Sequence, residues 1–87
     1  MKDMLNLRVK EVAANIRKIR EHCNYTQEYL AAKLKISQNA YSKIELGYTK
    51  ITVERLFRIA DILEVDAISI LNNENADALN ILSADSA

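Results

Sequence analysis

The chain has 87 residues, 49% of them hydrophobic, which is enough for one small packed domain and too short for two. It contains no proline, one glycine and one cysteine, which excludes an internal disulfide and leaves none of the glycine-containing turns that β-hairpins favour. No apolar run approaches the roughly 20 residues that span a membrane, and the first residues lack the apolar core of a secretory signal. We therefore expect an all-α protein of the reducing cytoplasm, with no membrane segment.

Charge is unevenly distributed along the chain, although the formal net charge is zero. Residues 1–50 contain ten Lys or Arg and five Asp or Glu, whereas residues 51–87 contain two and seven. The two halves therefore carry +5 and −5. This asymmetry fits a basic working face on an otherwise acidic protein.

The first half of the sequence predicts two helices. Apolar residues recur at spacings of three and four, which predicts a first helix with one buried stripe: Val9, Val12, Ala13, Ile16, Ile19 and Cys23. Asn24 suits the left-handed conformation that often ends a helix. The Thr26 hydroxyl then predicts the N-cap of a short second helix over residues 26–34, whose buried side consists of Leu30, Ala31 and Leu34.

A third helix is predicted over residues 37–46, directly after a tight connection at residues 35–36. Ser37 is its predicted N-cap, and Gly47 is placed to end it. On a helical wheel, one side of this segment is apolar and carries Ile36, Ala40, Tyr41 and Ile44. We therefore expect Tyr41 in the core. The opposite side carries Gln38, Asn39, Ser42 and Lys43.

The second half predicts two further helices and a tail. Thr52 is expected to cap a fourth helix whose buried set is Leu56, Ile59, Ala60 and Leu63, with Val53 and Phe57 alongside. Asp66 is expected to cap a short fifth helix that includes Ile68 and Leu71. Residues 72–87 are rich in Asn, Ala, Asp and Ser. We expect a domain over residues 1–71 and a C-terminal tail over residues 72–87 that is either frayed or stabilised by a partner.

Two short helices joined by about two residues, the second followed by a glycine, form the sequence outline of a helix-turn-helix. The second helix of such a pair enters the DNA major groove. A side-chain amide presents one donor and one acceptor in a fixed fork that matches adenine N6 and N7, and lysine can donate to guanine O6 and N7. An ordinary solvated helix face would gain more from paired charges. The candidate base-reading residues are therefore Gln38, Asn39, Ser42 and Lys43.

Three segments of the sequence extend this outline: "IRKIRE" (16–21), "TQEYLAAKLKISQNAYSKIELG" (26–47) and "ERLFRIADILEV" (54–65). Together they resemble the Cro/phage-repressor type of helix-turn-helix domain, known as the XRE family. The resemblance implies a compact five-helix bundle of the lambda-repressor-like DNA-binding type. It also implies a homodimer that binds a near-palindromic operator in double-stranded DNA.

The resemblance further implies roles for individual residues. Gln27 would contact a phosphate and brace Gln38, and the positive end of a helix suits such a contact. The same loop that follows the third helix in the family would contact the DNA backbone through Tyr48, Thr49 and Lys50. A structural pair that ties the first helix to the third is matched by Arg20 and Glu45.

The remaining reactive residues do not suggest catalysis. His22 and Cys23 are the two soft metal ligands, but neighbouring residues on a helix point about 100° apart. A zinc site needs about four ligands, and a Cys–His catalytic pair needs mutual approach. We expect no enzyme activity, no metal site and no cofactor.

Three functions remain open at this point. The leading hypothesis is a sequence-specific transcriptional regulator, most simply a repressor. An antitoxin would bind DNA in the same way and would also mask a toxin partner, and nothing in the sequence separates the two. The third hypothesis is a protein-interaction module that has kept the fold and lost DNA binding. The retained amides oppose that third hypothesis: Gln27, Gln38 and Asn39.

Overall fold

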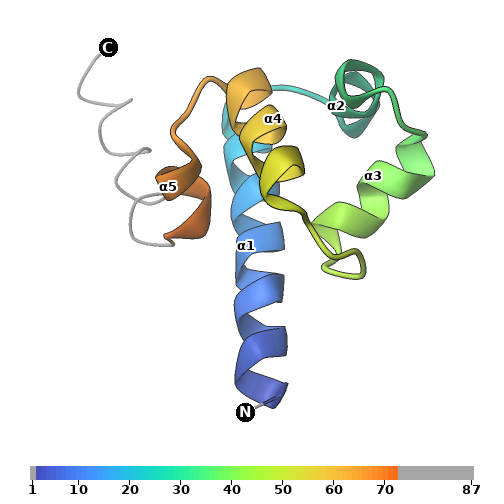
Figure 1. Cartoon of the computed structure of the whole chain (residues 1–87). Coiled ribbons are helices and arrows are strands. Elements are labelled where there is room, and N and C mark those ends of the chain that lie inside the picture. The colour runs from blue at the N-terminus through green and yellow to red at the C-terminus, as the bar shows by residue number, and fades with distance from the viewer. Residues whose placement is uncertain (1, 73–87) are drawn as a thin grey trace.

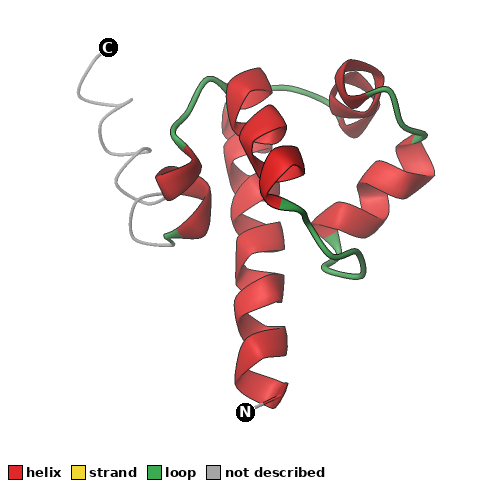
Figure 2. Cartoon of the chain, viewed as in Figure 1, coloured by secondary structure: helices red, strands yellow, loops and turns green. Residues whose placement is uncertain are grey.

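The computed structural model describes residues 2–72, and these residues form five α-helices without any strand (Figure 1, Figure 2). The helices are α1 (Lys2–His22), α2 (Gln27–Leu34), α3 (Gln38–Glu45), α4 (Val53–Leu63) and α5 (Ala67–Leu71). Figure 1 shows α2 and α3 on one side of α1 and α5 on the other. The predicted all-α, five-helix fold is confirmed. The predicted tail lies outside the described residues, apart from Asn72.

Helix α1 is longer than its apolar stripe indicated. The stripe is confirmed, because Ala13, Ile16 and Ile19 are buried and the other members are half-buried. The helix nevertheless begins at Lys2, and its N-terminal end extends beyond the other helices (Figure 1). These first turns do not pack on the core, so no repeating pattern of buried residues marks them in the sequence. No helix among residues 2–72 combines the length and the hydropathy that a membrane crossing requires.

Hydroxyl caps begin the three middle helices, as the sequence predicted. Thr26 accepts a hydrogen bond from the Tyr29 N–H at 3.0 Å, and the same arrangement recurs at Ser37 and Thr52. Asp66 is the N-cap residue of α5, as predicted, but its side chain makes no capping hydrogen bond. Helix α5 is held instead by a tertiary contact from α1.

That contact comes from Asn15, a buried polar residue of α1. Its side-chain Nδ2 donates a hydrogen bond of 2.8 Å to the backbone oxygen of Ile70 in α5. The Ile70 side chain is fully buried beside it. A buried amide is costly unless it is paired, so this bond both satisfies Asn15 and fixes α5 against α1.

Left-handed residues end four of the five helices, and in each case the following backbone N–H groups bond back to the last turn. After α2, for example, the Ile36 N–H donates to the Ala31 oxygen at 3.0 Å. Gly47 fits this role best, since it has no Cβ and lies so close to α1 that an added Cβ would be 3.1 Å from Lys10 Cγ. The four positions are Asn24, Lys35, Gly47 and Glu64.

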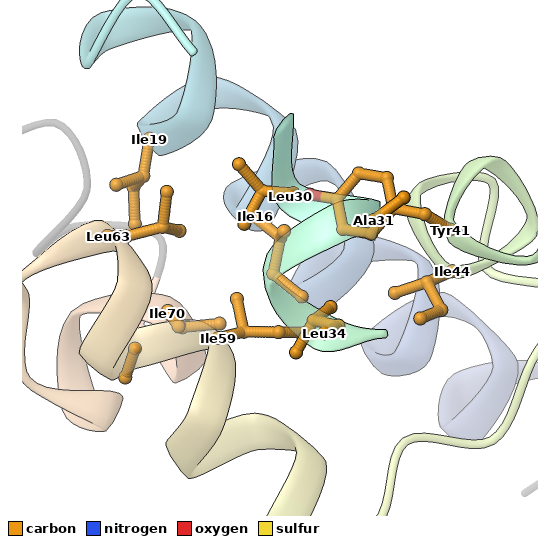
Figure 3. Packing of buried hydrophobic residues seen from close by; sticks show 11 residues of the cluster. Ile16, Ile19, Leu30, Ala31, Leu34, Tyr41, Ile44, Ile59, Leu63 and Ile70 are labelled. Atoms are coloured by element: carbon orange, nitrogen blue, oxygen red, sulfur yellow. The ribbon is translucent and has the colours of Figure 1, made fainter. Parts of the chain in front are cut away.

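Side chains from all five helices meet in one core (Figure 3). Its buried members are Ile16, Ile19, Leu30, Ala31, Leu34, Tyr41, Ile44, Ile59, Ala60, Leu63 and Ile70. The expected core position of Tyr41 is confirmed. The placement of Val53 and Phe57 alongside the buried set of α4 was wrong, because both are exposed. They lie four residues apart on the solvent side of α4, away from the stripe that faces α1 and α2.

Candidate nucleic-acid interface

The connection between α2 and α3 is short and well defined. Lys35 adopts φ 60° and closes α2, the Ile36 side chain packs against the core, and Ser37 caps α3 by accepting from the Ala40 N–H. Each of the three residues in this connection therefore contributes to the fold. Helices α2 and α3 therefore form one unit, and α3 lies at the surface of the molecule (Figure 1).

Helix α3 has two contrasting faces. Its inner face is buried and consists of Tyr41, Ile44 and Glu45. Its outer face is exposed at Gln38, Asn39 and Lys43, while Ser42 is half-buried. Within residues 2–72, those three exposed side chains make neither a hydrogen bond nor an ion pair. Their donors and acceptors are therefore available to a ligand.

Arg20 and Glu45 join α1 to α3. Arg20 Nε lies 2.6 Å from Glu45 Oε2, and Arg20 Nη2 lies 3.0 Å from Oε1, so the contact is bidentate. Arg20 Nη1 also donates to the Tyr25 backbone oxygen at 2.8 Å. The Glu45 side chain is only 2% exposed. The pair thus fixes the C-terminal end of α3 relative to α1 and to the α1–α2 connection.

Gln27 enters the same network from the first turn of α2. Its Nε2 donates to Glu45 Oε1 at 3.0 Å, a bond that the sequence did not suggest. An amide nitrogen carries two hydrogens, so one remains after this bond. The geometry links Gln27 to the far end of α3 through Glu45, and the bracing of Gln38 stays a prediction.

The loop after α3 contributes exposed side chains at Tyr48, Thr49 and Lys50. A groove of about 370 Å³ lies between α3, this loop and the start of α4, and three cationic side chains line it: Lys43, Lys50 and Arg55. No acidic residue of the described chain lines this groove. Arg55 was not among the predicted site residues. The signal that could have found it is its place in the first turn of α4, directly after the loop.

Comparison with protein families agrees with this geometry. Residues 16–69, more than half of the chain, match a helix-turn-helix family of the Cro/phage-repressor type. The chain belongs to this XRE family. It is accordingly a DNA-binding helix-turn-helix regulator, and the family is not typically enzymatic. Comparison with curated proteins and with solved structures finds no match for this chain.

The electrostatics of this XRE domain centre on Glu45. Burial by itself raises the pKa of this carboxyl, but the hydrogen bonds from Arg20 and Gln27 outweigh burial, and the pKa lies below its ordinary value. The bond to Glu45 likewise raises the pKa of the Arg20 guanidinium. Burial, with the Glu45 charge nearby, raises the pKa of the Tyr41 phenol. The Tyr41 hydroxyl is buried and makes no hydrogen bond within residues 2–72. The cluster is therefore charged as a fixed ion pair at neutral pH.

Proposed function

We propose that this XRE-family protein is a sequence-specific transcriptional repressor that binds a near-palindromic operator as a homodimer. The observation that carries the proposal is the outer face of α3, where Gln38, Asn39 and Lys43 are exposed and unbonded within the described residues. Amide and ammonium groups match the base edges of the major groove, whereas they add little to a helix that only meets water.

The proposed contacts divide into two classes. Base edges are read from α3, by Gln38, Asn39, Ser42 and Lys43. The DNA backbone is contacted around the ends of that helix, by Gln27, Tyr48, Thr49 and Lys50. Arg55 joins the second class, because it lines the cationic groove beside α3. Phosphate contacts set register and affinity, and base contacts set the sequence that is preferred.

The proposed operator follows from the geometry of two copies. Each copy reads one half-site, and the half-sites lie about one helical turn, or roughly 34 Å, apart. A dimer bound to an operator inside a promoter would exclude polymerase from that promoter.

The test is selection of bound duplexes from a randomised DNA library by the full chain. We expect an enriched site with two inverted halves, and loss of preference at one or two positions per half when Gln38→Ala is used. A matched control is Phe57→Ala, since Phe57 is exposed on α4 away from the interface. Failure to enrich any sequence would favour a protein-interaction module instead.

A reporter gene with the selected site across its promoter then tests repression. We expect expression to fall when the wild-type chain is supplied and to recover with Gln38→Ala. Increased expression would contradict a repressor while leaving sequence-specific binding intact. A small protein that co-purifies with the chain and releases it from DNA would indicate an antitoxin.

A further inference from the structure

A groove of about 510 Å³ lies between the N-terminal half of α1 and the loop that follows α3. Residues from positions 5–12 of α1 form one wall, and residues 47–51 of the loop form the other. Figure 1 shows this loop beside α1. We call the space between them the α1–loop groove. It has the size of a small-molecule site, since such sites measure roughly 300–1,000 Å³.

Much of the α1–loop groove is aliphatic. Four of its lining side chains are half-buried and form an apolar floor: Val9, Val12, Ile51 and Leu56. Leu5 and Leu71 extend this apolar surface outward, and they are 63% and 56% exposed. Covering these side chains removes them from water, so the groove favours a ligand with a hydrocarbon part.

Two cationic side chains line the same groove, one on each wall. Arg8 belongs to α1 and Lys50 to the loop, and both are exposed. Neither makes an ion pair or a hydrogen bond with any other residue of the described chain. Among residues 2–72, no Asp or Glu lines this groove. Its charges therefore complement an anion.

We propose that the α1–loop groove binds a small amphipathic carboxylate, with the anionic end at Arg8 and Lys50 and the hydrocarbon body on the apolar floor. The planar guanidinium of Arg8 matches both oxygens of a carboxylate, and Lys50 adds a second positive charge. A phosphate alone would use the two cations but would leave the apolar floor in water. The groove therefore suits a molecule that has both parts.

This site depends on residues that the family match does not include. Its α1 wall lies before residue 16, where the matched segment begins, and Leu71 lies after residue 69, where that segment ends. The XRE domain itself supplies the loop and Leu56. The binding site is thus assembled from the family's fold and from flanking residues of this chain.

The loop between α3 and α4 connects the α1–loop groove with the cationic groove beside α3. Thr49, Lys50 and Ile51 line both grooves. A Lys50 ammonium group that pairs with a bound carboxylate is less available to a DNA phosphate. The ligand and DNA therefore weaken each other's binding, and by the same factor. This regulatory consequence rests on the proposed function, whereas binding of the carboxylate does not.

NMR titration of the full chain with sodium octanoate tests the site. We expect saturable binding, and each methylene added between butyrate and octanoate should tighten it by roughly two- to fourfold. Octanol lacks the charge and octylamine reverses it, so each should bind at least about fivefold more weakly than octanoate.

A matched pair of variants tests the role of Arg8. Arg8→Gln should lower the affinity for octanoate by roughly 5- to 10-fold, because it removes one of the two cations. Lys18→Gln also removes an exposed cation from α1 but lies outside the groove, so it should leave the affinity unchanged. The same spectra check that both variants fold. Equal affinities of Arg8→Gln and the wild type would overturn the proposed anion position.

The resonances that move show where octanoate binds. We expect shifts at Val9, Ile51 and Leu56 and none in α2, which contributes no residue to the groove. Absence of saturation, equal binding of octanol, or shifts confined to other residues would overturn the site. So would large shifts of residues 73–87 on titration, which would indicate that octanoate displaces them from the groove. Groove signals that change with protein concentration alone would mean that a second copy covers it.

Gel shifts with the selected operator test the link to DNA separately. Saturating octanoate should weaken operator binding by roughly fivefold or more, and butyrate at the same concentration should have little effect. Octanoate that binds in the groove without changing the affinity for DNA would overturn the regulatory link. A chain that binds no duplex would be a failure of the proposed function, and the NMR titration would still decide whether the carboxylate site exists.

Discussion

The two faces of α3 show how stability and recognition are separated on one short helix. The inner face is closed, with Tyr41 and Ile44 in the core and Glu45 tied to Arg20. The outer face is open, with Gln38 and Asn39 unbonded within residues 2–72. A change on the inner face should therefore alter folding, and a change on the outer face should alter binding. Each of the following variants probes that separation.

The largest expected effect is on the inner face, at the ion pair. Arg20→Met leaves the carboxylate of Glu45, which is 2% exposed, without its charge partner. We expect the free energy of unfolding to fall by about 3–5 kcal/mol, a large share of the stability of a small domain. Urea denaturation measures this loss. Combining Arg20→Met with Glu45→Leu should return much of it, and a single-variant loss below about 1 kcal/mol would show that the pair is not structural.

Acid should weaken the same contact gradually. The folded-state pKa of Glu45 lies below the ordinary value of 4.5, so the folded state binds the proton less tightly than the unfolded chain does. Its contribution to stability is therefore complete above that ordinary value and is lost as the pH falls through the lower folded-state pKa. Thermal unfolding between neutral pH and about pH 3 should show a smaller decrease for Glu45→Gln than for the wild type. Parallel curves would contradict this assignment.

On the outer face, Gln38→Ala should act on binding alone. We expect affinity for the selected operator to fall by about 1–3 kcal/mol, with affinity for random duplexes unchanged. The free energy of unfolding should stay within about 0.5 kcal/mol of the wild type, because Gln38 is exposed and unbonded within the described residues. Gel shifts on both duplexes, together with denaturation, measure the three quantities. Equal losses on both duplexes would move Gln38 to the backbone-contacting class.

Lys50→Ala, in the loop beside the outer face of α3, should weaken binding without changing the preferred sequence. The lysine is exposed on the loop and lines the cationic groove, so we expect all duplexes to be bound more weakly by a similar factor. The slope of log affinity against log salt should decrease by about 1, as expected for one lost phosphate contact. Salt titrations of binding measure the slope. A change confined to one sequence would show that Lys50 reads a base.

The smallest expected effect comes from a change outside both faces, in the connection between α2 and α3. Lys35 holds a left-handed conformation that costs a non-glycine residue about 1–2 kcal/mol. Lys35→Gly should therefore raise the free energy of unfolding by about 0.5–1 kcal/mol after the greater chain entropy of glycine is counted. Operator preference should not change. Denaturation and a gel shift together check this, and a loss of stability would show that the lysine stem contributes packing.

The local signals in the sequence were sufficient for the three middle helices and for the outer face of α3. Hydroxyl caps at Thr26, Ser37 and Thr52 mark where helices begin, and Asn24 and Gly47 mark where two of them end. Each of these signals depends on a few adjacent residues. Amphipathic spacing then separates the core side of α3 from its polar side, because the period of a helix is fixed by its backbone.

Only the tertiary structure decided which distant residues meet. Asn15 bonds a backbone oxygen 55 positions away, and Gln27 bonds Glu45 across 18 positions. Lys35 and Glu64 adopt left-handed conformations that neither residue favours, because the packing of the next helix requires the chain to turn there. Arg55 joins two lysines only after α4 packs against α1 and α2. Residue type and spacing specify local backbone geometry, whereas the partners of a buried amide or a clustered charge depend on how whole helices pack together.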